Sequence, residues 1–141
     1  LATGRVRIIP SAVGGGFGSK LDISLQPLIG LVTLKTGRPC RMVYSRQESM
    51  TSTTKRHPAR MRGRIGCDVQ GRITGLEFEG RFNTGAYSSW GPTVANRVPV
   101  HVSGPYLTPN ITATARAIHT HGPVSGAFRG FGVPQGALWQ E

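Results

Sequence analysis

Two glycine-rich segments carry the residues best suited to binding an anion. Residues 14–20 read GGGFGSK, and residues 125–135 read SGAFRGFGVPQ. A glycine loop that leads into a helix brings backbone N–H groups and the positive end of the helix dipole up to a negatively charged group. In the second segment, Arg129 adds a forked pair of donors for phosphate or a similar anion, and Phe131 adds a flat apolar surface. The predicted chemistry is the binding of an anionic group beside an aromatic surface.

The first loop does not fit the two common phosphate-binding motifs. A Walker A motif requires Gly-Lys-Ser/Thr, whereas Lys20 is preceded by Ser19 and followed by Leu21. The dinucleotide motif GxGxxG requires glycine at position 19, which is serine. The sequence therefore argues against an ordinary ATP site and against a Rossmann site.

A structural explanation of both loops stays open beside the functional one. Residues 14–18 could be a tight turn that lets a strand and a helix pack closely, and Arg129 could pair with a carbonyl while both neighbouring phenylalanines lie in the core. Phe17 favours function, because a large apolar ring in a glycine loop is costly if it faces water. We expect Phe17 to be inserted into something.

The elements that must position the loops indicate an α+β fold. Residues 4–10 alternate apolar and charged, which predicts a strand before the first loop. After that loop, residues 25–35 have helical spacing, with Asp22 or Ser24 as the cap and Gly37 as the stop. This helix is the main one that we expect.

The rest of the chain is predicted to be mostly strands and long irregular loops around a mixed sheet. We expect strands at 41–45, 60–68, 71–82 and 111–119, a loop or weak helix at 47–56, irregular backbone at 85–109 and a helix beginning at 137–141. The strands 60–68 and 71–82 form a hairpin around an Asp68–Gly71 turn, with Thr74, Leu76, Phe78 and Phe82 on one face. At 141 residues, one domain is expected.

Charge suggests one alternative function. Seventeen Lys and Arg against six Asp and Glu give a net charge of +11, so an anionic partner is expected. Arg60, Arg62 and Arg64 share a strand face behind the basic run 55–57, which could follow the phosphates of a nucleic acid. However, aromatic residues are not interleaved with this stripe, so no base-stacking platform is evident.

Cysteines, histidines and apolar runs indicate the redox compartment and bear on metal binding and membrane contact. Cys40 and Cys67 lack metal-site or disulfide spacing and predict free thiols in a reducing compartment. His119 and His121 could bind a metal, but no Cys, Asp or Glu lies at ligand spacing, so we favour ordinary strand and loop residues. No apolar run could span a bilayer, and a cytoplasmic protein without membrane contact is expected.

The two loops together resemble a known family. GGGFGSK, followed by GRPCRMVYSRQESM, KRHP, GPYLTPNI and then AFRGFGVPQ, resembles in order and spacing the molybdopterin-binding large subunit of molybdenum hydroxylases, the xanthine dehydrogenase and aldehyde oxidase family. The resemblance covers nearly the whole chain and is nearest to nicotinate dehydrogenase-type subunits. It implies that residues 1–141 are part of the molybdenum-cofactor-binding domain, cut at both ends.

The resemblance implies roles for both loops. Gly15, Gly16, Phe17, Gly18 and Arg129 would bind the cofactor, with Phe17 and Arg129 lining the molybdenum pocket without ligating the metal. Phe131 would stack on the ring of an aromatic substrate.

Two further positions bear on the substrate. Arg97 aligns with an arginine that hydrogen-bonds heterocycles in xanthine-oxidising relatives, while Leu21 stands where those relatives carry a glutamate. Without the resemblance, Arg97 would read as a surface arginine. The resemblance implies a flat N-heterocycle, with or without a carboxylate, or an aromatic aldehyde, with Arg97 as its charge partner.

The remaining machinery is expected outside this chain. In the family, the base is a glutamate in a Gly-x-Gly-Glu motif, which this sequence lacks, so no catalytic base is assigned here and the isolated chain is expected to be inactive. The cofactor would be molybdopterin with molybdenum, in its cytosine dinucleotide form, with FAD and [2Fe-2S] centres on partner subunits or domains. The partners would be the remainder of the large subunit, the iron–sulfur and FAD subunits and a small-molecule substrate, and exposed core surface would favour oligomers. A purely structural or assembly domain is the third possibility.

Overall fold

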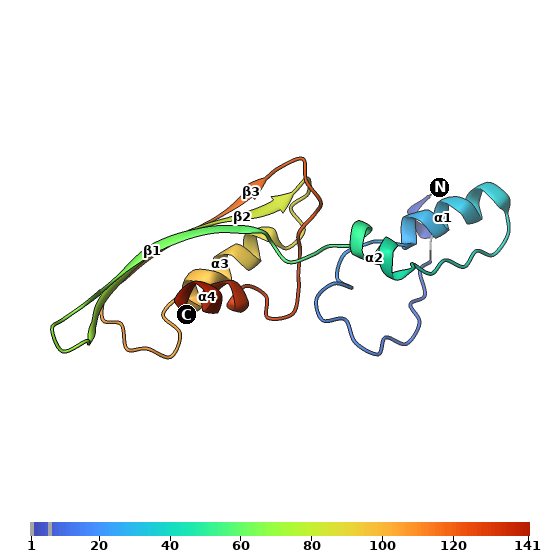
Figure 1. The fold of residues 1–141 in the computed structure, drawn as a ribbon. Coiled ribbons are helices and arrows are strands. Elements are labelled where there is room, and N and C mark those ends of the chain that lie inside the picture. The colour runs from blue at the N-terminus through green and yellow to red at the C-terminus, as the bar shows by residue number, and fades with distance from the viewer. Residues whose placement is uncertain (1, 6) are drawn as a thin grey trace.

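A three-stranded sheet with two covering helices forms the body of the molecule, and a loosely packed N-terminal part lies beside it (Figure 1). The computed structural model describes residues 2–5 and 7–141. The N-terminal part contains the 3-10 helix η1 (Thr3–Arg5), α1 (Gln26–Thr36) and α2 (Arg46–Ser52). Neither α1 nor α2 has a buried residue, and neither packs against a helix or strand of the described chain.

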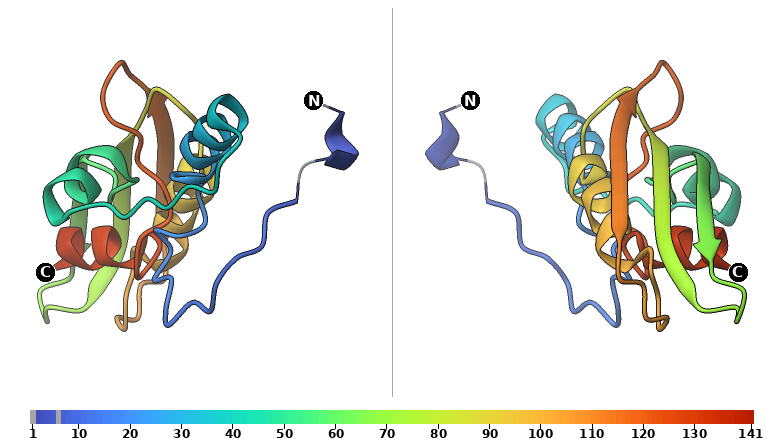
Figure 2. Two further views of the ribbon diagram at one scale, coloured as in Figure 1. Left: turned by 90° about the vertical axis from the view of Figure 1, so that its right-hand side faces the viewer. Right: turned by 90° about the vertical axis from the view of Figure 1, so that its left-hand side faces the viewer.

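The sheet is mixed, as the sequence predicts. β1 (Ala59–Cys67) pairs antiparallel with β2 (Ile73–Gly85), and β2 pairs in parallel with β3 (Ile111–His119), so β2 is the central strand. A parallel pair needs a crossover connection, and α3 (Gly91–His101) supplies it. α3 and α4 (Val133–Gln140) lie side by side against the sheet (Figure 2).

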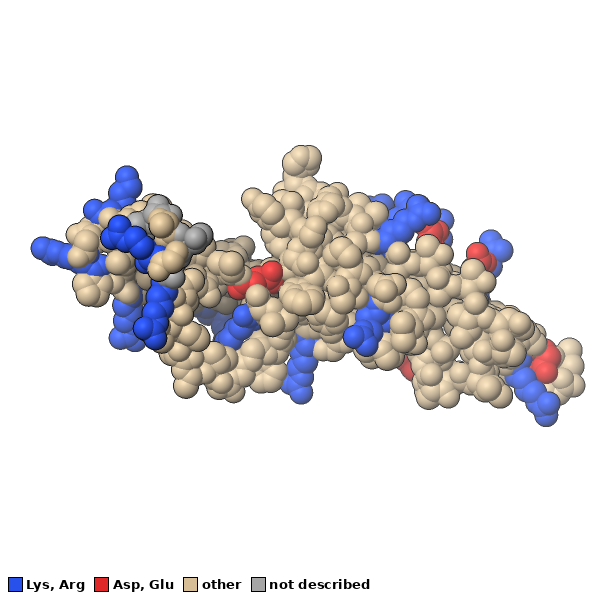
Figure 3. All heavy atoms as spheres, turned by 180° about the vertical axis from the view of Figure 1, so that it is seen from behind, with Lys and Arg blue, Asp and Glu red and all other residues tan. Residues whose placement is uncertain are grey.

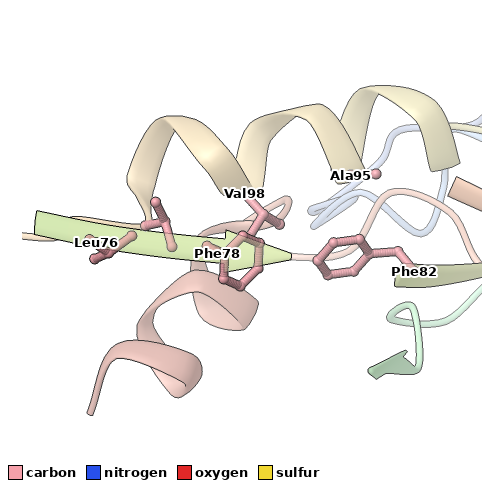
Figure 4. Packing of buried hydrophobic residues seen from close by; sticks show 6 residues of the cluster. Leu76, Phe78, Phe82, Ala95 and Val98 are labelled. Atoms are coloured by element: carbon pink, nitrogen blue, oxygen red, sulfur yellow. The ribbon is translucent and has the colours of Figure 1, made fainter. Parts of the chain in front are cut away.

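The core forms between β2 and α3. Leu76, Phe78 and Phe82 alternate along β2 and are buried, while the intervening charged residues face outward. They pack with Ala95 and Val98 of α3 (Figure 4) and with Val102 directly after it. From α4, Trp139 packs edge-on against the Phe78 ring, with ring centroids 5.0 Å apart. Burial of each such side chain contributes about 1.5–3 kcal/mol, so this contact region holds the body together.

Helix α3 corrects the expectation of irregular backbone at 85–109. Gly91-Pro92 and Pro99 read as turn signals, yet Pro92 stands in the first turn, where its missing N–H costs little. Val94, Ala95, Val98 and Val102 follow the helical i, i+3, i+4 pattern and are buried, the last three in the cluster with the apolar residues of β2. That burial outweighs the cost of Pro99 inside the helix, which is about 3 kcal/mol.

The strands predicted at 4–10 and 41–45 are wrong. Residues 7–10 and 41–45 have no regular structure, η1 occupies Thr3–Arg5, and Val6 lies outside the described residues. An alternating pattern forms a strand only where another strand supplies hydrogen-bond partners, and the described sheet contains neither segment. Side-chain capping of α1 is also wrong: its N-cap is Leu25, and Asp22 bonds elsewhere.

Several local predictions are confirmed. The helix predicted at 25–35 is α1, which ends at Gly37 in the left-handed conformation. The weak helix expected within 47–56 is α2, which begins with a reciprocal capping box between Ser45 and Glu48. The Ser45 backbone N–H, which donates to the Glu48 carboxylate, and then the Ser45 side chain lower the pKa of Glu48. The hairpin turns through Asp68–Gly71, although Thr74 is exposed, and the last helix starts earlier than expected, at Val133.

Candidate functional site

The two glycine loops lie against each other. A Cβ atom on Gly18, whose φ is +92°, would come within 2.8–2.9 Å of the backbone at Ala127 and Phe128 in the second loop. The Arg129 guanidinium lies over the Phe17 ring, 5.6 Å from its centroid. Segments more than 100 residues apart in sequence therefore meet at one place, with an arginine and an aromatic ring at their contact.

Phe17 is not inserted into the chain, contrary to expectation. Its side chain is 66% exposed, because Arg129 covers only part of the ring. In the second loop, Phe128 is exposed and Phe131 is half-buried, so neither phenylalanine lies in the core. The purely structural explanation of the second loop is therefore wrong for both aromatic rings.

Arg56 braces the second loop from the opposite side, a role that sequence reasoning missed. Its guanidinium donates to the backbone carbonyl of Arg129 and to Oε1 of Gln135, and it lies 4.8 Å from the centroid of the Phe128 ring. Partial burial lowers its pKa. The sequence placed Arg56 in a basic stripe, and no local pattern indicates a contact 73 residues away.

Beside Arg56, His57 is buried without a hydrogen-bond partner. The residue is 3% exposed, and neither ring nitrogen has a partner in the described chain. Burial, and then the charge of Arg56, lower the pKa of His57. The folded state therefore holds the neutral imidazole and resists protonation.

This lowered pKa predicts that stability falls in mild acid. Below about pH 6.5, the ordinary histidine pKa, the unfolded chain binds a proton that the folded chain rejects, so the free energy of unfolding decreases by up to about 1.4 kcal/mol per pH unit until the folded-state pKa is reached. Above that pH the imidazole is neutral in both states and contributes no pH dependence. We expect His57→Gln to flatten the slope of unfolding free energy between about pH 7 and 5, and His121→Gln, at an exposed histidine, to leave it unchanged. Equal slopes in both variants would contradict the prediction.

The backbone is strained at three points, two in the loops and one close to them. Phe17, Ser89 and Phe131 have φ of 49°, 41° and 46°, and they are the non-glycine residues with positive φ in the described chain. Such conformations cost about 1–3 kcal/mol each and cluster at functional sites. Gly130 and Gly132, which flank Phe131, also have positive φ.

Trp90 and Arg97 complete the aromatic side of the site. The Trp90 ring meets the Phe131 ring edge-on, with centroids 6.1 Å apart. A Cβ atom on Gly132, next to Phe131, would lie 3.1 Å from the Cβ of Arg97. Both Trp90 and Arg97 are exposed, and they lie two turns apart along α3. Arg97 was predicted from the sequence, whereas Trp90 was not. The only signal for Trp90 was the presence of a tryptophan in a Gly/Pro-rich segment.

Leu21 belongs to a neighbouring cleft. The cleft has a volume of about 630 Å³, and its walls come from the end of the first loop, the last residues of α2 and those after it, the turn before α3 and residues 123–124. Leu21 is 60% exposed there, and Asp22, Thr54 and Ser89 also line the cleft. Phe17, Arg129, Arg97 and Phe131 are not part of this lining. The predicted site residues thus fall into two neighbouring groups that share the first loop.

A family model described as "Molybdopterin cofactor-binding domain" matches residues 1–141. The chain belongs to this family. It is 47% identical over 141 residues to the nicotinate dehydrogenase large molybdopterin subunit of Eubacterium barkeri, and 37% identical over 139 residues to the xanthine dehydrogenase/oxidase of Felis catus. The match covers all of this chain in the first case and 97% in the second, but only 33% and 10% of the relatives.

The fold of this molybdopterin cofactor-binding domain is similar to solved structures of aldehyde oxidoreductases. The Desulfovibrio gigas enzyme superposes with a TM-score of 0.82 at 30% identity, over 91% of this chain and 14% of that one. The Desulfovibrio desulfuricans enzyme gives 0.79 at 32% identity, over 87% of this chain and 14% of that one. The family resemblance drawn from the two loop motifs is confirmed.

The other functions that the sequence suggested are not supported. The relatives named above are oxidoreductases, which gives nucleic-acid binding no support, although basic side chains predominate on one face and are densest over the end that carries α1 (Figure 3). In residues 2–5 and 7–141, no group of three His, Cys, Asp or Glu side chains could hold a metal, and both cysteines are free. No described helix is long and apolar enough to cross a membrane.

Proposed function

We propose that this domain forms one wall of the molybdenum site in the large subunit of a hydroxylase that acts on an N-heterocycle or an aldehyde and takes its oxygen from water. The meeting of the two glycine loops at Phe17 and Arg129 is the observation that carries the proposal. The chain spans one third of the length of the nicotinate dehydrogenase subunit, so the activity belongs to a larger assembly.

The residues of the two loops fit an anionic cofactor. Arg129 is exposed, and among residues 2–5 and 7–141 its guanidinium makes no ion pair, so its donors are free for phosphate or dithiolene groups. A Cβ atom on Gly16 would meet only the Lys20 Cβ, at 3.7 Å, so the backbone there is open to a ligand. We propose Gly15, Gly16, Phe17, Gly18 and Arg129 as the cofactor-binding residues. Bound molybdopterin would supply the molybdenum centre that accepts electrons from the substrate.

The aromatic side of the site suits a flat substrate. Phe131 and Trp90 offer two ring faces at a wide angle, and Arg97 lies beside them to bind a polar or negatively charged substituent. Leu21, in the adjoining cleft, adds apolar surface at the position where xanthine-oxidising relatives carry a glutamate, and the Asp22 carboxylate of the same cleft accepts a hydrogen bond from Ser89. These contacts favour an aromatic substrate that carries a carboxylate.

The rest of the assembly follows from the family. We propose the cytosine dinucleotide form of the pterin, FAD and [2Fe-2S] centres on partner subunits, and a cytoplasmic enzyme in which residues 1–141 are one part of the cofactor-binding domain. The catalytic base would come from another part of the large subunit.

The test is to purify the full-length protein with its co-expressed partners. We expect about one molybdenum and one pterin per large subunit, measured by mass spectrometry. With an N-heterocycle or an aromatic aldehyde as substrate and isotopically labelled water as solvent, the product should carry the label. A preparation that folds and assembles but holds no molybdenum would overturn the proposal, and so would an unlabelled hydroxylated product.

Arg97 gives a sharper test of the substrate. Replacing it with methionine keeps the length of the side chain but removes the charge, so KM for a pyridine carboxylate should rise about tenfold or more, while KM for the uncharged parent ring changes little. Arg116→Met, at an exposed arginine of β3, is the matched control and should leave both constants unchanged. Unaltered kinetics of the Arg97→Met enzyme would remove the proposed role.

A further inference from the structure

A partly buried hydrogen bond joins the end of the first glycine loop to the turn before α3. The Ser89 hydroxyl donates to Oδ1 of Asp22 at 2.7 Å, across 67 residues of sequence. Asp22 directly follows Leu21, and Ser89 directly precedes Trp90. The bond therefore connects the two groups of proposed site residues.

The second glycine loop closes on the same bond. A Cβ atom on Gly126 would lie 2.5 Å from Ser89 Oγ, 2.9 Å from Asp22 Oδ2 and 3.2 Å from the Thr54 Cβ. Gly126 is held there by its own N–H, which donates to the Lys55 carbonyl at 3.0 Å. A side chain here would have to displace the Ser89 hydroxyl and the Asp22 carboxylate, so glycine lets the second loop lie against the bond between the first loop and the turn before α3.

Two buried oxygen atoms at this junction lack hydrogen-bond partners within the described chain. They are Oδ2 of Asp22 and Oγ1 of Thr54, and Thr54 is only 8% exposed. A buried unpaired polar atom costs about 1–3 kcal/mol, so an apolar pair at these positions would serve stability better. A need for stability alone therefore does not explain polar side chains at this junction.

The bond also holds a strained residue. Ser89 has a φ of 41°, in the left-handed region that side-chain-bearing residues seldom adopt. Strain of this kind persists only where surrounding contacts enforce it. The residue that follows, Trp90, makes the edge-on contact with Phe131.

We propose that Asp22 is a positioning residue that, through Ser89, holds the Trp90 ring against Phe131 and so sets the aromatic wall of the substrate site. The inference rests on the proposed function, because it assigns that wall to the substrate. Asp22 acts through Ser89 and Trp90 and touches neither substrate nor cofactor in this role. Loss of the bond frees Ser89 to leave its strained conformation, and the Trp90 ring then loses its fixed orientation.

The test compares variants of the assembled full-length enzyme. In Asp22→Ala and Ser89→Ala, KM for an aromatic substrate should rise about tenfold, the effect expected when a hydrogen bond to a charged group is lost, with kcat changed less than about threefold. Ser89→Gly also lacks the hydroxyl, but glycine adopts a φ of 41° without strain, so its KM should rise less than that of Ser89→Ala. Asp22→Asn keeps an oxygen that accepts from Ser89 and should restore KM to near the wild-type value. Asp68→Ala, at a carboxylate in the hairpin turn, and Ser88→Ala, at the neighbouring exposed serine, are matched controls and should behave as wild type.

A second readout needs no turnover. The near-ultraviolet circular dichroism of Asp22→Ala, minus that of wild type, should match in sign and shape the difference produced by Trp90→Phe, because both remove the ordered contribution of Trp90. The double variant Asp22→Ala/Ser89→Ala should be no worse than either single variant.

The outcomes separate this inference from the proposed function. Wild-type enzyme without molybdenum or hydroxylation contradicts the proposed function itself. If the wild type is active, an unchanged KM and an unchanged Trp90 signal in Asp22→Ala overturn the positioning role. A loss of molybdenum and of kcat in Asp22→Ala, with KM unchanged, overturns it equally, since that pattern belongs to a brace of the cofactor loops.

Discussion

Replacing Gly18 with alanine in the full-length enzyme should separate the two glycine loops and lower the molybdenum content by about tenfold or more. Alanine at a φ of +92° costs about 1–2 kcal/mol in backbone strain alone. Its Cβ would also come within 2.9 Å of backbone atoms of Ala127 and Phe128, which cannot move aside as a flexible side chain could. The loops must then part, and the contact between Phe17 and Arg129 is lost with them. Molybdenum per subunit and kcat/KM are the quantities to measure.

Gly14→Ala is the matched control in the same loop. Its Cβ would meet nothing within 4 Å, and Gly14 is not among the glycines with positive φ. We expect this variant to keep its molybdenum and its activity. If Gly18→Ala retains full cofactor as well, the contact between the loops is not what forms the site.

The elements that local sequence determines were predictable. The β1–β2 hairpin follows from the alternation of Leu76, Phe78 and Phe82 and from a turn whose Asp68 carboxylate accepts backbone N–H groups. Helix α1 follows from helical spacing and a glycine stop at Gly37. In each case the signal and the structure lie within about ten residues of each other, so no distant contact is needed to interpret them.

The predictions fail where contacts between residues distant in sequence determine the local structure. α3 forms because Ala95 and Val98 pack against the sheet, and that burial overrides the turn signals of Pro92 and Pro99. Residues 7–10 alternate like a strand but have no pairing strand in the described chain. The roles of Arg56 and Trp90 could not be predicted for the same reason, because their contacts join segments far apart in sequence.

The candidate site was predictable in part, through its motifs. Phe17 and Arg129 were paired on motif resemblance, and the structure brings them together, although their role toward the cofactor stays a prediction. What the sequence could not show is how the loops are held. Strain at Phe17, Ser89 and Phe131, the Arg56 brace and the Asp22–Ser89 bond all depend on the folded backbone. Strained residues that contacts from distant parts of the sequence hold in place are typical of a pre-organised site.

Arg129→Leu should weaken cofactor binding by about ten- to a hundredfold, which corresponds to about 1.5–3 kcal/mol for hydrogen bonds to a charged group. Leucine keeps the apolar stem but removes every donor, and it also removes the cation that lies over the Phe17 ring. The expected result is enzyme of normal thermal stability with little molybdenum and a matching loss of kcat/KM. Arg129→Lys keeps the positive charge but not the two parallel donors of the guanidinium, so its molybdenum content should lie between that of wild type and that of Arg129→Leu.

Arg64→Leu on β1 is the control, because Arg64 is an exposed arginine on the sheet, away from both glycine loops. It should retain molybdenum and activity, which would show that removing one positive charge from a strongly basic chain has no effect of its own. Thermal unfolding distinguishes cofactor loss from misfolding: the backbone carbonyl of Arg129, not its side chain, receives the Arg56 brace, so the loop should keep its shape in Arg129→Leu. If Arg129→Leu holds a full complement of molybdenum and turns over at the wild-type rate, the guanidinium does not bind the cofactor and its contact with Phe17 is structural only.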